Sequence, residues 1–179
     1  MEKHLAQSRW LISIFLLPCA MAFALDELVL NQDDLYKPEV VSAWLKKNGA
    51  KADKARAKLF YDEGVKAKKR KNWGLAGKGF GDSALRYPTP QAINETAEVE
   101  LRMLGEIRDR NKDRKVHLKS DLASAESLYR SALAADSVLN TLSVEDKQRT
   151  RQNAECVSAY VKTGTAQSAC APLQAYGIK

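Results

Sequence analysis

The 179-residue chain has 29 basic and 22 acidic residues, a net charge of +7 and a hydrophobic content of 45%. A chain of this length is enough for one domain that buries most of its apolar surface, so a second domain is not required. Only two histidines and three cysteines are present. This scarcity argues against a zinc site built from Cys and His ligands.

The first 24 residues have the three parts of an export signal. Lys3 and Arg9 give a positive start, residues 10–17 form a short apolar stretch, and residues 22–24 read Ala-Phe-Ala, the small-x-small pattern of a cleavage site. A membrane-spanning helix would need roughly twenty apolar residues. We therefore expect a signal peptide over residues 1–24.

Cleavage before Leu25 leaves a mature chain, 25–179, that we expect to be one domain, periplasmic or secreted, with no transmembrane span. It stays basic at +6, because the signal removes two basic residues and one acidic residue. A lipid anchor on Cys19 is disfavoured because Pro18 stands where a lipoprotein signal needs a small residue. An uncleaved amphipathic helix or anchor is the alternative.

The mature chain contains two cysteines, Cys156 and Cys170. An oxidising compartment pairs such residues, and their spacing is too wide for a CxxC redox motif. Closing a loop of about 15 residues contributes on the order of 3 kcal/mol. We expect a structural disulfide, and the alternative is two buried free thiols.

The mature sequence predicts helices throughout. Pro38 can begin the first helix, Pro88 and Pro90 end the third, and Pro172 interrupts the last. A charged connector over residues 111–115 separates the fourth helix from the fifth. β-branched residues nowhere alternate with polar ones over five positions, so we expect an all-α fold. The expected helices are 38–48, 52–69, 75–86, 93–110, 121–139, 144–162 and 166–175.

Two of these helices carry more specific expectations. In helix 52–69, the residues on the buried side are expected to be Ala55, Leu59, Phe60 and Ala67, with charged residues elsewhere. Helix 144–162 begins after Ser143, whose hydroxyl can accept a hydrogen bond from the free amides of the first turn.

An internal repeat begins in the second predicted helix. Gly64 is followed after twelve residues by Ala76 and then by Phe80, with Trp73 at the turn and Pro88 at the end. The pattern resembles the tetratricopeptide repeat, a pair of antiparallel helices of about 34 residues. In that family, small residues let the two helices approach closely. The resemblance implies that Gly64 and Ala76 face one another.

Two further units are similar but degenerate. Gly105 and Ala125 repeat the pattern with eight extra residues between them, which are the charged connector. Residues 157–173 align as a third unit and place Cys156 opposite Cys170 across the last hairpin. The resemblance implies a short stacked array of antiparallel hairpins, and an irregular helical bundle with chance matches is the alternative.

Four glycines, Gly74, Gly77, Gly79 and Gly81, lower the helix propensity of the third helix by roughly 1 kcal/mol each relative to alanine. We expect them to let another helix or a loop pack tightly. A phosphate loop is not expected, because such a loop needs Gly-Lys followed by Ser or Thr between a strand and a helix, and here Gly follows Lys78.

Catalytic groups are sparse. His117 is the sole histidine of the mature chain and lies in the charged connector, where a solvated side chain is commoner than a general base. Glu98 and Glu100 are two apart on a helix and point in different directions, so they do not form a carboxylate pair. We expect no enzyme activity, no cofactor and no metal.

Positive charge is concentrated at the end of the second helix, where cations complement exposed carbonyl groups. One interpretation is a solvated helix end. The other is a contact for an anionic partner, such as a lipid head group or polysaccharide. Nucleic acid is not expected, since an exported protein meets little of it. The residues, within 66–71, are Lys66, Lys68, Lys69, Arg70 and Lys71.

The tetratricopeptide resemblance also implies that the first helices of successive hairpins line a concave groove for a peptide or a partner helix. We expect a protein-binding or scaffold module. The residues implied are Lys58, Tyr61, Asp62, Val65 and Lys68 of the first hairpin and Arg102 and Glu106 of the second.

Overall fold

Helices make up most of the described chain. The computed structural model describes residues 28–111, 118–165 and 170–178, and of these 80% are helical and none lies in a strand. The all-α prediction is confirmed for this part of the chain. The elements are η1 (Gln32–Tyr36), α1 (Pro38–Asn48), α2 (Lys54–Lys69), α3 (Trp73–Arg86), α4 (Pro90–Arg110), α5 (Lys119–Leu139), α6 (Val144–Thr163) and α7 (Ala171–Ala175).

Most helix ends fall within three residues of their predicted positions. The prediction for Pro172 is wrong, because this residue lies in the first turn of α7, where its missing N–H is not needed, and does not interrupt the helix. The short 3₁₀ helix η1 was not predicted. The expected signal peptide (1–24), Cys19 and His117 lie outside the described residues.

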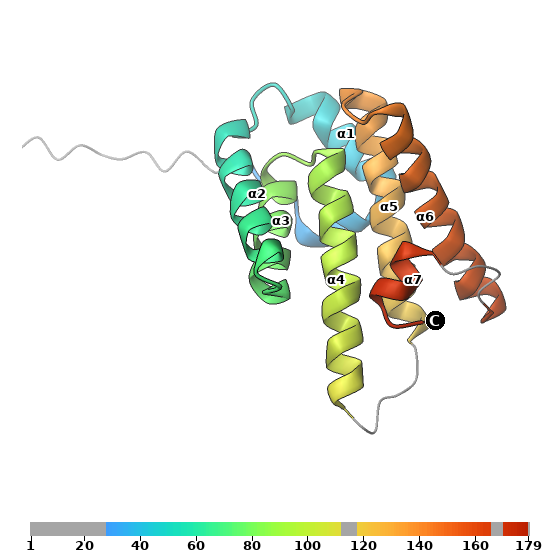
Figure 1. Cartoon of the computed structure of the whole chain (residues 1–179). Coiled ribbons are helices and arrows are strands. Elements are labelled where there is room, and N and C mark those ends of the chain that lie inside the picture. Colours follow the sequence, from blue (N-terminus) through green and yellow to red (C-terminus); the bar gives the residue numbers. More distant parts are fainter. Residues whose placement is uncertain (1–27, 112–117, 166–169, 179) are drawn as a thin grey trace, which may run out of the picture.

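The helices pack in chain order, with α4 between the α2–α3 hairpin and the α5–α6 hairpin (Figure 1). α1 and α7 are exceptions, because α1 packs against α5 rather than against α2 and α7 packs against α4 as well as α6. In an ideal repeat array each unit contacts only its neighbours. The α1–α5 contact therefore departs from that pattern.

The main core lies between α1, α4, α5 and η1. Its fully buried side chains include Val41, Ile93, Leu101, Leu122 and Leu128. A second, smaller cluster joins the α2–α3 hairpin to α4 and consists of Ala67, Ala76, Phe80 and Val99. The first hairpin thus packs on α4 through this small cluster and contributes one further buried residue, Ala84 of α3, to the larger core.

α2 and α3 touch through their backbones at Gly64 and Gly79. A Cβ on Gly79 would lie 2.6 Å from the backbone nitrogen of Gly64, and a Cβ on Gly64 would lie 2.7 Å from the Phe80 ring. The expected close approach of this hairpin is present, but Gly79 rather than Ala76 meets Gly64. Ala76 is fully buried one turn away, in the small cluster with Phe80.

The buried face of α2 differs from the prediction. Ala55 and Leu59 are exposed, and Leu59 retains 56% of its accessible surface. The residues that face α3 are Ala57, Gly64 and Ala67. Because the backbones meet at Gly64, the small side chains lie under α3 and the larger Leu59 is turned to solvent.

Side-chain caps fix where several helices begin. The Ser143 hydroxyl accepts from the Asp146 amide at 3.0 Å, which confirms the predicted cap of α6. Asn72 does the same for α3, where its side-chain oxygen accepts from the Leu75 amide at 3.2 Å.

Candidate binding groove

Three hollows follow one another along α4 and share residues. The central hollow, of about 200 Å³, is bounded by α2, α4, α5 and α6. A first hollow of about 400 Å³ shares Tyr61 and Gln91 with it, and a third of about 410 Å³ shares Glu98. We refer to the three together as the groove. It follows α4 from Gln91 to Asp109, about 27 Å at 1.5 Å per residue.

The first hollow contains three residues that the sequence assigned to a groove. Lys58 and Asp62 form an exposed ion pair of 2.7 Å one turn apart on α2. Tyr61 lies beside them, half-buried, with its ring centroid 5.3 Å from that of Phe80. Val65 packs instead against the small cluster around Phe80.

Lys68 crosses from α2 to α4. Its ammonium group lies 2.6 Å from a Glu95 oxygen and 2.9 Å from a Glu98 oxygen. Burial lowers the pKa of Lys68, but the hydrogen bonds and charges of the two carboxylates outweigh burial and leave this pKa above its ordinary value. Lys68 is therefore held charged between the central and third hollows.

Arg102 is the second cation of this ion-pair network. Its guanidinium group lies 3.2 Å from the other oxygen of Glu98 and 5.1 Å from the Trp73 ring centroid. Burial raises the pKa of Glu98, yet Lys68 and Arg102 together bring it below its ordinary value. Arg102 and Trp73 line the third hollow, together with Glu106, which pairs with Arg110 at 3.0 Å.

The central hollow has two tyrosines and two carboxylates along its sides. Tyr61 and Tyr129 come from α2 and α5, and Glu95 and Glu98 lie one turn apart on α4. Burial raises the pKa of Tyr129, and the charges of Glu98 and Glu95 raise it further. Burial and Glu95 likewise raise the pKa of Tyr61. Both phenols are therefore neutral and able to donate hydrogen bonds.

α6 forms the far side of the central hollow. Asn94 of α4 donates to the Thr150 hydroxyl of α6 at 2.8 Å, which joins the two helices directly. Arg149 of α6 pairs with Asp146 at 3.1 Å, and Asn153 lies one turn further along the same side.

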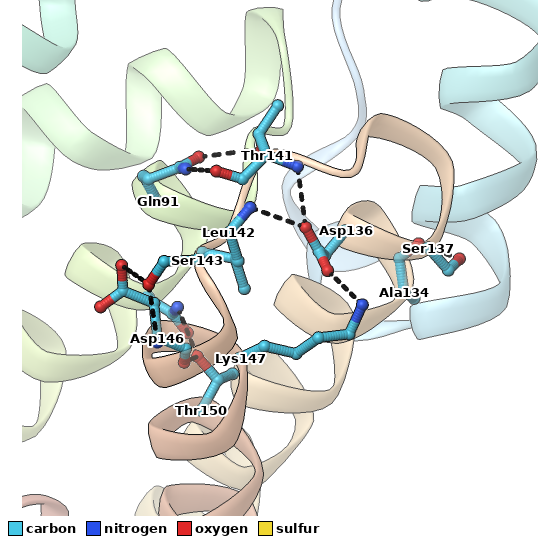
Figure 2. A network of polar contacts seen from close by, with 11 residues as sticks. Gln91, Ala134, Asp136, Ser137, Thr141, Leu142, Ser143, Asp146, Lys147 and Thr150 are labelled. Atoms are coloured by element: carbon cyan, nitrogen blue, oxygen red, sulfur yellow. Dashed lines mark hydrogen bonds and ion pairs between the residues drawn. The ribbon is translucent and has the colours of Figure 1, made fainter.

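A polar network fixes the α5–α6 turn at the end of this hollow (Figure 2). Asp136 is 1% exposed, and one of its oxygens accepts from the amides of Thr141 and Leu142 at 2.9 and 2.8 Å. Its other oxygen lies 2.7 Å from the Lys147 ammonium group. Gln91 donates to the Thr141 carbonyl at 2.9 Å, so the turn is also tied to the start of α4.

Burial raises the pKa of Asp136. The hydrogen bond from Lys147 and those from the Leu142 and Thr141 amides outweigh burial, so that this pKa lies below its ordinary value. The carboxylate is ionised at neutral pH and holds the start of α6 against α5.

The C-terminal segment forms one side of the third hollow. Gly105 packs against the backbone of Tyr176, since a Cβ at Gly105 would lie 2.8 Å from the Tyr176 carbonyl oxygen. The Tyr176 hydroxyl donates to Asp121 at 2.7 Å and accepts from the Leu118 amide at 3.1 Å. The resemblance implied that Gly105 faces α5, as its counterpart faces the second helix of a repeat, but Gly105 contacts this segment instead.

The predicted disulfide is present. Cys156 of α6 is bonded to Cys170, the residue before α7, with 6.6 Å between the two Cα atoms. It attaches α7 to α6 while Tyr176 attaches the following residues to α4 and α5. A disulfide is consistent with an oxidising compartment outside the cytoplasm.

The basic cluster divides between two faces of α2. Lys68 faces α4, as described above, whereas Lys66, Lys69, Arg70 and Lys71 are exposed and make no ion pair within the described residues. Lys66 and Arg70 border a separate hollow of about 510 Å³ on the outer side of the α2–α3 hairpin, whereas Lys71 lines the third hollow of the groove. Leu59 and Leu75 are more than half exposed, and Leu75 lines that hollow.

Several groove residues were missed from the sequence. Tyr129 lies in the predicted helix 121–139 among apolar residues, and nothing local indicates that it lines a hollow. Glu95 and Glu98 are three apart on one helix, a spacing that places two carboxylates on the same face. Arg149 and Asn153 share a face of α6 in the same way. The sequence shows that each of these pairs shares one face of its helix. It does not show which helix lies on the other side of the hollow.

Among the described residues, no set of three or more His, Cys, Asp or Glu side chains is arranged to hold a metal ion. None of the helices within 28–111, 118–165 and 170–178 is long and apolar enough to cross a membrane.

No family model matches the chain, and the searches of curated proteins and of solved structures found no match either.

Proposed function

We propose that this protein is an exported protein-binding module, periplasmic or secreted, of the tetratricopeptide type. It binds a peptide or helix of a partner protein in the groove and has no catalytic activity of its own. One observation carries the proposal. The three repeat units that the resemblance implies begin in α2, α4 and α6, and all three of these helices contribute side chains to the same hollow. That arrangement is what the resemblance implied for a concave binding face.

The dimensions of the groove support a peptide ligand. Its length of about 27 Å matches about eight residues of extended chain. Its sides combine aromatic rings with amides and charged groups, the composition that gives a peptide both contact area and orientation. The residues concerned are Tyr61, Trp73, Gln91, Glu98, Arg102 and Asn153.

Photo-crosslinking tests the proposal. A photoreactive residue at position 149 in the groove, with one at the exposed Glu155 as control, is used to capture partners from the exported fraction, which are identified by mass. The captured protein is then bound to purified variants. Asn153→Trp fills the central hollow and should weaken binding at least tenfold, whereas Glu155→Trp on the same helix should not. Equal binding by both variants refutes the groove.

A second candidate function is supported by the cations without an ion pair at the end of α2 and in the turn that follows it. Lys66, Lys69, Arg70 and Lys71 can bind an anionic envelope component, a lipid head group or polysaccharide, by charge. Charge reversal at Lys66, Lys69 and Arg70 separates the two candidates, and Lys68 is left unchanged because it holds α2 to α4. Loss of a strongly salt-sensitive binding activity favours this second function, and unchanged binding favours the groove.

A further inference from the structure

The central hollow is lined by a tyrosine whose ring is buried and whose hydroxyl makes no hydrogen bond within the described residues. Tyr129 is 3% exposed, and its hydroxyl makes no hydrogen bond to any residue that the structure describes, although the residue lines the hollow. A buried tyrosine usually has a partner for its hydroxyl. The hydroxyl is therefore available to a ligand that enters the hollow.

The charged side chains around this hydroxyl indicate which charge a ligand should carry. Glu95 and Glu98 line the central hollow, whereas Lys68 and Arg102, the cations that pair with them, line the third hollow. The second oxygen of Glu95 makes no hydrogen bond or ion pair within the described part of the chain. Arg149 is the cation that lines the central hollow, and Asp146 pairs with it. The side of the hollow next to Tyr129 therefore presents carboxylate oxygens.

The size of the hollow limits the ligand further. At about 200 Å³ it is smaller than the 300–1,000 Å³ of sites for drug-sized molecules. It suits one long side chain. Two tyrosine rings beside carboxylates attract a cation through both the ring faces and the charges. A guanidinium group has five donors in a plane and reaches separate acceptors at once, which a single ammonium group does less well.

We propose that the central hollow binds an arginine side chain of the partner peptide, whose guanidinium group donates to the Tyr129 hydroxyl and to the free oxygen of Glu95. This inference rests on the proposed peptide-binding function and adds the residue that such a peptide must carry. The groove on either side of the hollow accommodates the flanking peptide residues.

Titration with small probes tests the inference without knowledge of the partner. N-acetyl-argininamide is added to the ¹⁵N-labelled folded protein with its disulfide intact, and amide chemical shifts are followed by NMR. N-acetyl-citrullinamide, which has the same shape and no charge, is the control. We expect saturable shifts at Tyr61, Glu95, Glu98, Tyr129 and Asn153, and binding of the citrulline probe at least tenfold weaker.

Tyr129→Phe removes the hydroxyl and keeps the ring, so the fold is retained. It should weaken arginine binding about tenfold or more, the effect of one hydrogen bond to a charged group. Tyr160→Phe on α6, outside the lining of the hollow, is the matched control and should change nothing. Equal affinity for the two probes, or unchanged binding by Tyr129→Phe, overturns the inference.

The two proposals fail separately. A partner that crosslinks at position 149 and places no arginine in the hollow refutes the arginine site and leaves the groove function in place. Arginine binding that depends on Tyr129, without any captured partner that Asn153→Trp weakens, supports the site and refutes the groove function.

Discussion

The α2–α3 and α5–α6 hairpins are both pairs of antiparallel helices, but different interactions hold them together. In α2–α3 the two backbones touch at Gly64 and Gly79, and no side chain fits between them. In α5–α6 a buried carboxylate, Asp136, fixes the turn through two amides and Lys147. The close packing of α2 and α3 therefore requires residues without side chains at the contact. The packing of α5 and α6 requires the charged Asp136 carboxylate. Each kind of dependence predicts a different response to mutation.

The largest effect is expected at Asp136. Asp136→Ala leaves Lys147 without its partner and the Thr141 and Leu142 amides without an acceptor, so the free energy of unfolding should fall by about 3 kcal/mol in urea denaturation. Glu126→Ala on the same helix removes a partly exposed pair with Arg130 and should cost about 0.5 kcal/mol. Equal losses of unfolding free energy for the two variants would show that the buried Asp136–Lys147 pair does not stabilise the fold more than a partly exposed pair does.

The charge-dependent part of this stabilisation should vary with pH. The pKa of Asp136 is lowered in the folded protein, so the carboxylate stabilises the fold above its unfolded pKa and loses this contribution as pH falls through the folded pKa. The difference in unfolding free energy between wild type and Asp136→Asn should therefore be constant near neutral pH and should narrow below about pH 4. A difference that is the same at pH 3 and pH 7 would contradict the role of charge.

A smaller loss is expected when volume is added to the first hairpin. Gly79→Ala places a methyl group 2.6 Å from the Gly64 nitrogen, so the helices must separate and the free energy of unfolding should fall by about 2 kcal/mol. Gly81→Ala in the same helix meets nothing within 4 Å and should instead stabilise by about 1 kcal/mol through helix propensity. Stabilisation by both substitutions would show that the backbones are not in contact.

The smallest effects should be shared by both hairpins. Asn72→Ala and Ser143→Ala remove the caps of α3 and α6, and each should lower the free energy of unfolding by about 1 kcal/mol. Ser124→Ala inside α5 is the control and should be neutral or slightly stabilising. A large difference between the two caps would show that one hairpin is held by more than the interactions described here.

Local sequence signals were sufficient to predict where the helices lie in the chain. They were insufficient to predict which residues of two helices come into contact. Pro38 and Ser143 mark helix starts through backbone chemistry that involves only neighbouring residues, so these positions were predicted correctly. Ala76 and Gly79 lie three apart on the same face of α3, and periodicity alone does not say which of them meets Gly64. The answer depends on how far one helix is shifted along the other.

The residues of the groove could likewise be predicted from the sequence only in part. The resemblance named Lys58, Tyr61, Asp62 and Lys68 from α2, which do face α4 or line a hollow. It did not name Tyr129, because an aromatic residue in an apolar stripe is indistinguishable in sequence from a core residue. Its position beside a hollow results from where α6 lies, which the buried Asp136 determines and which no local pattern encodes.

The contact between α1 and α5 has a consequence for how the molecule unfolds. An open stack of hairpins can lose its terminal units one at a time, because each unit is held only by the next. Here α1 lies on α5, and α7 at the other end lies on α4, so neither end of the described chain can detach without disturbing the middle. We therefore expect one cooperative transition rather than stepwise fraying, with all probes of structure lost together.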